Sequence, residues 1–240
     1  MSKTKFAKEL VKFVQAQYRS LADPSKAPNM AAYMKTEMPF YGIAKPERLP
    51  VYREVKKRFR SESREDYEAG VIALWNLPYR EEKYAALDFA RHNERFVNAD
   101  SMPLYERLIR EGAWWDLVDE IATHLSGRVL LRQRAALKPI IKQWIADDDM
   151  WIRRSALLSQ IGHKDRTDTK QLFGNCLLLA HEKEFFIRKA IGWSLRDYSW
   201  TNPDAVITFL GEHGVKLSPL SRREGAKRLI AVGLLTKEDV

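Results

Sequence analysis

Cysteine is almost missing from this sequence, because Cys176 is the only one among 240 residues. A single thiol cannot close an intrachain disulfide or build a thiolate metal cluster, and it favours a reducing cytoplasm as the location. Glycine and proline are also scarce, with 11 and 10 residues. Their scarcity disfavours collagen-like chains, disordered chains and all-β chains with many tight turns.

Long apolar segments are missing too. No stretch approaches the roughly eighteen consecutive apolar residues that a membrane-spanning helix needs. The start, Met1–Lys5, is cationic but lacks the apolar segment of a secretion signal. We therefore expect no secretion and no membrane partner.

Negative charge is outnumbered. Lysine and arginine number 41 against 32 aspartates and glutamates, which gives a net charge of +9. The cations are spread along the whole chain rather than concentrated in one amphipathic segment. This distribution favours a nucleic acid over a membrane surface as the polyanionic partner.

Apolar residues recur at three- and four-residue spacing almost from end to end, as at Phe6, Leu10, Phe13 and Val14, whereas alternating strand-like runs are scarce. The breaks carry turn or helix N-cap chemistry, and no Ser- or Gly-rich linker divides the chain. The sequence predicts about a dozen short helices that form a single all-α domain over residues 1–240.

The sequence also repeats itself. Residues 149–156 align with residues 184–191 at a shift of 35, and weaker echoes start near residues 79, 115 and 220. A helical repeat of this length predicts an α-solenoid, in which each unit stacks on its neighbours and the stack leaves a concave face. The alternative is chance similarity between amphipathic helices.

The signatures of common enzymes are absent. There is no His-Glu-x-x-His, no phosphate-binding glycine loop, no Gly-x-Ser-x-Gly elbow and no dinucleotide fingerprint. The five histidines are dispersed, and none is spaced i, i+4 from another to clamp a metal. The sequence thus indicates neither a metal nor a cofactor.

A helix expected over residues 184–199 carries the clearest candidate surface. On a helical wheel one arc is apolar, and Lys189, Trp193 and Arg196 fall within roughly 60° of one another on the opposite side. An indole between two cations suits stacking on nucleic acid, with the cations on phosphates. Burial of Trp193 under a neighbouring helix is the alternative.

A second helix, expected over residues 114–125, places Trp115 and Asp119 on one flank at i, i+4 spacing. A carboxylate repels DNA, so a chemical role is one reading of Asp119, and pairing with a nearby arginine is the other. In a third helix, Arg154 projects near apolar positions. Its guanidinium is expected to reach either a phosphate or a carboxylate.

The sequence resembles the AlkD-type DNA alkylation repair family over nearly its whole length. The shared segments keep their order and have compatible spacings, and the last is the most specific: Ala32–Lys35, Gly42–Arg48, Leu77–Glu81, Trp114–Asp119, Trp151–Ala156 and Lys183–Tyr198.

This resemblance implies a HEAT-like repeat solenoid with a concave basic groove. It also implies a monofunctional DNA glycosylase that excises cationic N3- and N7-alkylated purines from duplex DNA, without a deep base pocket. A monomer is the default expectation for the oligomeric state. Asp119 takes the role of catalytic carboxylate, and Trp115 and Trp193 form aromatic walls at the deoxyribose of the lesion.

The resemblance further implies DNA-binding residues: Tyr33, Arg154, Phe185 and Arg196, with Lys189 beside them on the wheel. Gly162 stands where family members carry a lysine, and Lys164 is the expected substitute. Two other functions compete with excision, namely a catalytically silent DNA-binding scaffold and a peptide-binding HEAT module.

Overall fold

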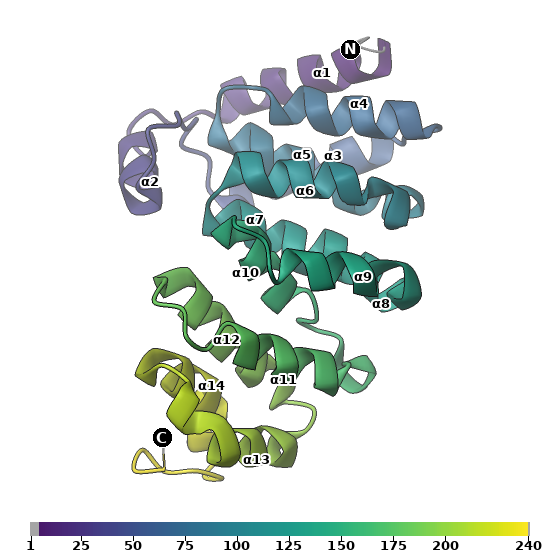
Figure 1. The fold of residues 1–240 in the computed structure, drawn as a ribbon. Helices are drawn as coiled ribbons and strands as arrows, with labels where there is room; N and C mark the ends of the chain where they lie inside the picture. Colours follow the sequence, from purple (N-terminus) through teal and green to yellow (C-terminus); the bar gives the residue numbers. More distant parts are fainter. Residues whose placement is uncertain (1–4, 240) are drawn as a thin grey trace. The chain divides into compact units, whose positions relative to one another are not determined.

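The computed structural model describes residues 5–239, and over that range the regular structure is helical, with no strand (Figure 1). The contacts between residues cluster into two compact units that divide between Val97 and Asn98. The all-α prediction is confirmed. The single domain predicted over residues 1–240 stays a prediction.

The first unit consists of the helices that precede this division. Glu81, at the start of the last long helix, is fully buried and accepts hydrogen bonds from the backbone N–H groups of Tyr41, Gly42 and Ile43. This carboxylate therefore fixes the loop that follows the second helix. The helices are α1 (Lys5–Leu21), α2 (Ala27–Met34), α3 (Lys45–Arg58), α4 (Arg64–Trp75), α5 (Arg80–His92) and the short η1 (Glu94–Phe96).

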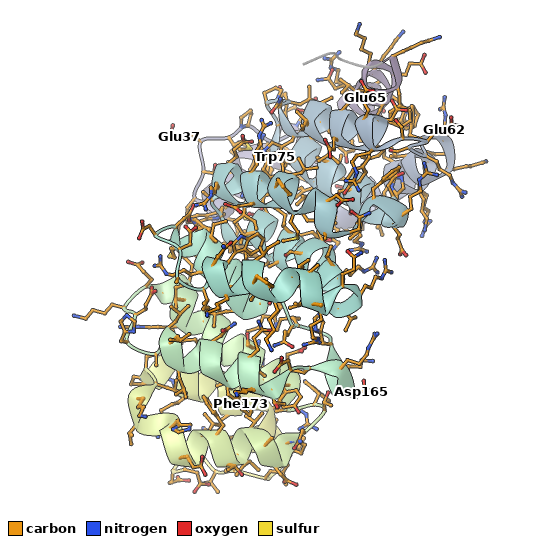
Figure 2. The ribbon with its side chains drawn as sticks, turned by 45° about the vertical axis from the view of Figure 1, so that its right-hand side comes forward. Glu37, Glu62, Glu65, Trp75, Asp165 and Phe173 are labelled. Carbon is orange, nitrogen blue, oxygen red and sulfur yellow. The ribbon has the colours of Figure 1, made fainter. Side chains whose placement is uncertain are left out.

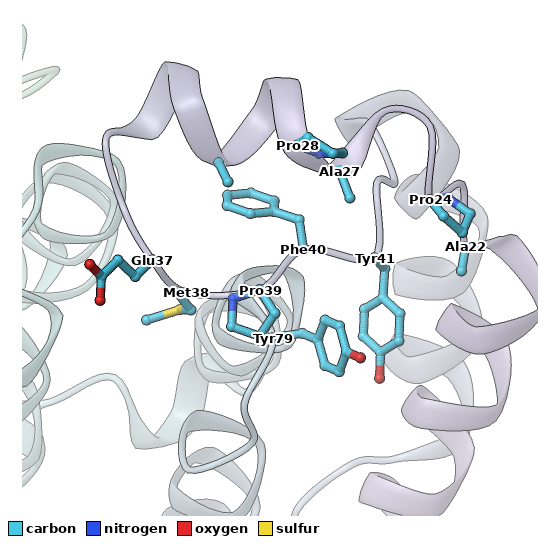
Figure 3. Close-up of a pocket in the computed structure, with 11 residues that line it drawn as sticks. Ala22, Pro24, Ala27, Pro28, Glu37, Met38, Pro39, Phe40, Tyr41 and Tyr79 are labelled. Carbon is cyan, nitrogen blue, oxygen red and sulfur yellow. The ribbon is translucent and has the colours of Figure 1, made fainter.

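Helix α2 is the most exposed helix of this unit, with no fully buried side chain. A cavity of about 420 Å³ lies beneath it (Figure 3). On one side of that cavity the rings of Tyr41 and Tyr79 stack with centroids 3.9 Å apart. Gly42 has a φ of +86°, and a Cβ there would lie 2.0 Å from the carbonyl oxygen of Asp23, so the turn after α2 requires glycine.

The second unit holds the remaining helices. Within it, α10 packs on α7 and α12, and α12 packs on α14, so consecutive repeats are neighbours. The helices are η2 (Ala99–Ser101), α6 (Met102–Gly112), α7 (Trp115–Ile121), η3 (Ala122–Ser126), α8 (Gly127–Arg132), α9 (Arg134–Trp144), α10 (Met150–Leu158), η4 (Lys164–Arg166), α11 (Thr169–Leu178), α12 (Phe185–Tyr198), α13 (Pro203–His213), η5 (Gly214–Lys216) and α14 (Pro219–Ala231).

Helix starts recur with the period that the sequence predicted. One helix of each repeat begins just after an N-cap residue, and these caps are spaced by 35 residues, with a last step of 34: Ala44, Tyr79, Trp114, Asp149, Glu184 and Ser218. The repeat is therefore structural rather than a chance similarity, and the α-solenoid of HEAT-like repeats is confirmed. The concave basic groove stays a prediction.

The buried face of α12 matches the predicted arc. Ile187, Ile191, Leu195 and Tyr198 are all buried. The helix lies against α14 so closely that a Cβ on Gly192 would stand 2.4 Å from the Cβ of Glu224. Only glycine at this position permits the observed approach of the two helices.

The helix expected over residues 114–125 differs from the prediction. Its α-helical part ends at Ile121 and continues as the π-helix η3 and then as α8. Ser126 donates its hydroxyl to the carbonyls of Ile121 and Ala122, which the wider turn leaves accessible. A Cβ on Gly127 would lie 2.7 Å from the Ala122 oxygen, so the glycine permits this geometry.

No helix within residues 5–239 has both the length and the apolar character needed to cross a bilayer. The chain start at residues 1–4, where a secretion signal was not expected, lies outside the described residues.

Candidate catalytic site and nucleic-acid interface

Asp119 of α7 and Arg154 of α10 form a bidentate ion pair. Nε of Arg154 donates to Oδ1 of Asp119 at 2.8 Å, and Nη2 donates to Oδ2 at 2.8 Å. The planar guanidinium matches the carboxylate with two parallel hydrogen bonds, which fixes the orientation of both groups. The sequence left two possibilities open, that Asp119 pairs with an arginine and that Arg154 reaches a carboxylate. The structure shows that each residue is the partner of the other.

The two members of this pair differ in their access to solvent. The side chain of Asp119 is 16% exposed and that of Arg154 is 6% exposed. The carboxylate is therefore the more accessible member of the pair. Each carboxylate oxygen keeps a second lone pair beyond the one that Arg154 occupies, so Asp119 retains acceptor capacity.

Burial shifts the ionisation of Asp119. Burial raises the pKa of this carboxyl above the ordinary value, Arg154 opposes that shift through its hydrogen bonds and charge, and Asp116 adds to the rise. The net direction is upward. Arg154 thus offsets part of the free-energy cost of removing the charged carboxylate from water, but not all of it.

Arg154 also contacts helix α12, which follows α10 in the stack of repeats. Its Nη1 donates to the carbonyl oxygen of Phe186, and its guanidinium lies 5.7 Å from the centroid of the Phe186 ring. The guanidinium therefore links α7, α10 and α12. Its direction toward Asp119 and Phe186 supports a role in holding the carboxylate, and the phosphate contact implied for Arg154 stays a prediction.

Three aromatic rings pack beside this link. Trp151 and Phe186 have centroids 4.9 Å apart, and Trp114 lies 5.4 Å from Phe186 and 5.9 Å from Trp151. Trp114 is only half-buried and serves as the N-cap residue of α7. Sequence reasoning missed this cluster. The 35-residue shift relates Trp151 to Phe186 and was the available signal.

Trp115 and Trp193 are both half-buried. Trp115 opens α7 and lies one helical turn before Asp119, as predicted. Trp193 lies in the middle of α12, so its indole is neither fully exposed nor enclosed. The roles of both residues at a damaged nucleotide stay predictions.

Lys189 and Arg196 share one carboxylate. Glu224 of α14 accepts from Nζ of Lys189 at 3.0 Å and from Nη1 of Arg196 at 2.8 Å. Burial raises the pKa of Glu224, but Lys189 and Arg196 outweigh it and lower the pKa below the ordinary value. The two cations that flank Trp193 are therefore partly neutralised. This acidic partner was missed by sequence reasoning, although it lies one repeat beyond Lys189.

Lys164 lies in an exposed loop after α10. Its φ is +55°, and it follows Gly162, whose φ is +77°. The N–H of Gly162 donates to Oδ2 of Asp197 at 2.9 Å, which ties the loop to α12. Figure 2 shows this loop at the labelled Asp165, which follows Lys164. The loop thus presents a lysine near Gly162, and the DNA contact expected of Lys164 stays a prediction.

Two of the expected DNA contacts are strongly exposed aromatic residues. Tyr33, on α2 of the first unit, is 73% exposed, and Phe185, at the start of α12, is 57% exposed. Both rings are accessible to a ligand, and their contacts with DNA stay predictions. Within residues 5–239, no three histidine, cysteine or acidic side chains gather in a way that could hold a metal ion.

Two comparisons with known proteins indicate the same family. The profile of a family described as DNA alkylation repair enzyme matches residues 14–229. A solved structure from Enterococcus faecalis, described as a predicted DNA alkylation repair enzyme, is similar with a TM-score of 0.75 and 34% sequence identity, over 87% of this chain and 96% of that chain. No curated protein matches the sequence.

Proposed function

This chain belongs to the family of DNA alkylation repair enzymes, and on that premise we propose that it is a DNA glycosylase for cationic alkylpurines. Membership of the family supports a role in the repair of alkylation damage and DNA as the partner. The proposed substrates are N3- and N7-alkylated purines in duplex DNA. We propose that the enzyme is a monomer, that it acts on DNA in the cytoplasm and that it needs neither a metal nor a cofactor.

The chemistry of these lesions requires little from the protein. A purine alkylated at N3 or N7 carries a positive charge, so its glycosidic bond is weakened and the base leaves as a neutral molecule. Positive charge then grows on the deoxyribose. A carboxylate fixed near C1′ stabilises that oxocarbenium-like transition state and orients the attacking water.

Asp119 is the group that fits this task, and its ion pair with Arg154 is the observation that carries the proposal. The carboxylate is the more exposed member of the pair and its position is fixed by two hydrogen bonds. A preorganised charge of this kind needs no rearrangement as the sugar becomes cationic. Trp115 and Trp193 are proposed to pack against the deoxyribose, where indole faces favour cationic charge.

The remaining contacts are proposed to hold the duplex. Lys189 and Arg196 flank Trp193, and Lys164 and the exposed rings of Tyr33 and Phe185 provide further contacts. Phosphate contacts of this kind fix position without reading sequence. The Glu224 carboxylate between the two cations of α12 is expected to weaken their hold on undamaged DNA.

The decisive experiment measures release of free base from duplex DNA that contains 7-methylguanine or 3-methyladenine. We expect release well above spontaneous depurination, and a loss of about a hundredfold or more for Asp119→Asn, in line with the removal of one preorganised electrostatic group. Wild-type release at the spontaneous rate, or an Asp119→Asn enzyme as active as wild type, contradicts the proposal.

The same samples separate the competing functions. A silent DNA-binding scaffold binds duplex DNA without releasing base, and its affinity for damaged DNA is unchanged when Trp115→Ala and Trp193→Ala are combined. A peptide-binding module binds DNA weakly and with little dependence on salt.

A further inference from the structure

Trp200 is the most exposed tryptophan of the described chain and lies in the turn two residues beyond the end of α12. It is 70% exposed, yet it is not isolated, because the guanidinium carbon of Arg228 lies 4.4 Å from its ring centroid. Arg228 is held in place by a 2.8 Å hydrogen bond from Nη1 to the carbonyl oxygen of Ser199. An indole is thus kept at the surface with a cation fixed against it.

This pair continues the surface that surrounds Trp193. Residues 189, 193, 196 and 200 are spaced by four, three and four positions, so on an α-helix they fall within roughly 60° of one another. The chain keeps its helical turns beyond Tyr198, because Ser199 donates to the carbonyl of Leu195 and Trp200 to that of Asp197. Lys189, Trp193 and Arg196 therefore share one side of α12, and Trp200 follows them in the turn after the helix.

Helix α14 supplies the matching partners. Glu224 pairs with the two cations of α12, and Arg228, one turn later, lies on Trp200. The same helix carries Arg223 and Lys227, both exposed. Arg228 therefore places positive charge directly on the Trp200 ring, and α14 carries two further exposed cations. Positive charge beside an exposed indole complements a polyanion rather than an apolar protein surface.

We propose that Trp200 and Arg228 form a further DNA-binding site, in which the indole packs on the deoxyribose of a nucleotide in the duplex and cations of α14 contact its phosphates. Exposing an indole to water gains nothing unless a flat or apolar group covers it, and nucleic acids offer both that group and negative charge. The site rests on DNA as the partner but not on base release.

The spacing along α12 sets how far this site lies from Trp193. Seven residues of α-helix span roughly 10 Å at 1.5 Å per residue. One DNA strand advances about 3.4 Å per nucleotide along the axis. A strand that runs along α12 and meets Trp193 at one nucleotide thus meets Trp200 about three nucleotides away.

Binding to an undamaged 15-base-pair duplex tests this site by fluorescence anisotropy. Trp200→Ala is expected to weaken affinity about fivefold, the lower end of what one aromatic contact with a nucleotide contributes, and Trp200→Phe is expected to restore most of it. Leu178→Ala is the control, because Leu178 is 60% exposed on α11, outside the proposed surface. It is expected to bind as wild type does.

A Trp200→Ala affinity within twofold of wild type overturns the proposal. An equal loss in Trp200→Ala and Leu178→Ala also overturns it, because the effect would then be general. Trp200 is the residue to change, since Arg228 also supports the Ser199 carbonyl and its removal would disturb the fold. Undamaged DNA keeps this test independent of the glycosylase proposal.

Discussion

Asp119 and Arg154 occupy the same position in two consecutive 35-residue repeats, and their side chains meet in a bidentate ion pair. Lys189 occupies that position in the next repeat and forms an ion pair with Glu224, which lies 35 residues later and one residue farther from the cap of its own helix. One sequence period therefore generates both pairs, because neighbouring repeats stack in register. The first pair fixes the candidate catalytic carboxylate, and the second moderates the candidate DNA-binding cations.

Breaking the Asp119–Arg154 pair from one side should destabilise the protein. Asp119→Asn leaves the buried guanidinium without its counter-ion, which typically costs about 3 kcal/mol of unfolding free energy. The double variant Asp119→Asn with Arg154→Met removes both charges and should lose less than the sum of the single changes. Urea unfolding of the three variants and wild type checks this, and additive losses would contradict it.

Base release by the wild type should fall as the pH is lowered through the raised pKa of Asp119. Burial lifts that pKa above the ordinary aspartate value, and the reaction needs the charged form. Activity should therefore decline at a higher pH than an exposed aspartate would give. A pH–rate profile corrected for spontaneous depurination measures this, and a flat profile down to the ordinary aspartate range would argue against the role.

The raised pKa of Asp119 affects stability in the opposite way to activity, because protonation of this group favours the folded state. A carboxyl whose pKa is higher in the folded state binds its proton more tightly there, so its contribution favours the fold below the unfolded pKa and is lost as pH rises through the folded pKa. Acid should therefore remove activity without this group unfolding the protein. Circular dichroism at the pH of half-maximal activity separates the two effects.

Glu224→Gln should strengthen binding to undamaged duplex DNA. The change frees Lys189 and Arg196 from their shared carboxylate, so the slope of log affinity against log salt should steepen by about one unit. Glu111→Gln changes the net charge equally, in an exposed pair with Arg107 on α6. It serves as the control, and equal slopes in both variants would refute the attenuating role of Glu224.

Gly192→Ala should destabilise the packing of α12 on α14. The new methyl group would lie 2.4 Å from the Cβ of Glu224 and 3.0 Å from the carbonyl oxygen of Ser221, which forces the helices apart at a cost of about 1–3 kcal/mol. Gly174→Ala on α11 meets nothing within 4 Å and should stabilise by up to about 1 kcal/mol. Thermal melts of both variants check the contrast.

Much of this fold follows from the sequence alone. The three- and four-residue apolar spacing predicts helices, and the buried arc of α12 at Ile187, Ile191 and Leu195 is observed as predicted. The 35-residue shift predicts the repeat because a helix pair can bury its apolar face only against a similar neighbour. These features depend on local periodicity, which a sequence displays directly.

The candidate site was predictable only in part. A helical wheel identifies Asp119 and Arg154 as unusual but does not say that they meet, because the pairing depends on the register between two repeats. The π-helix after α7 depends on Ser126 and on the tight fit at Gly127, which no periodicity reveals. The sequence did not identify Glu224 as the partner of Lys189 and Arg196, because this pairing depends on how α14 packs on α12.

The even spacing of the helix caps also bears on how such a chain can change in length. Excising residues 150–184 would remove one whole period of 35 and bring Lys189 to the place that Arg154 holds beside Asp119. Excising residues 185–219 would instead bring Glu224 opposite Arg154. Either deletion places charges of opposite sign at neighbouring repeat positions, so a chain that loses one whole repeat here keeps an attractive pair at the new junction.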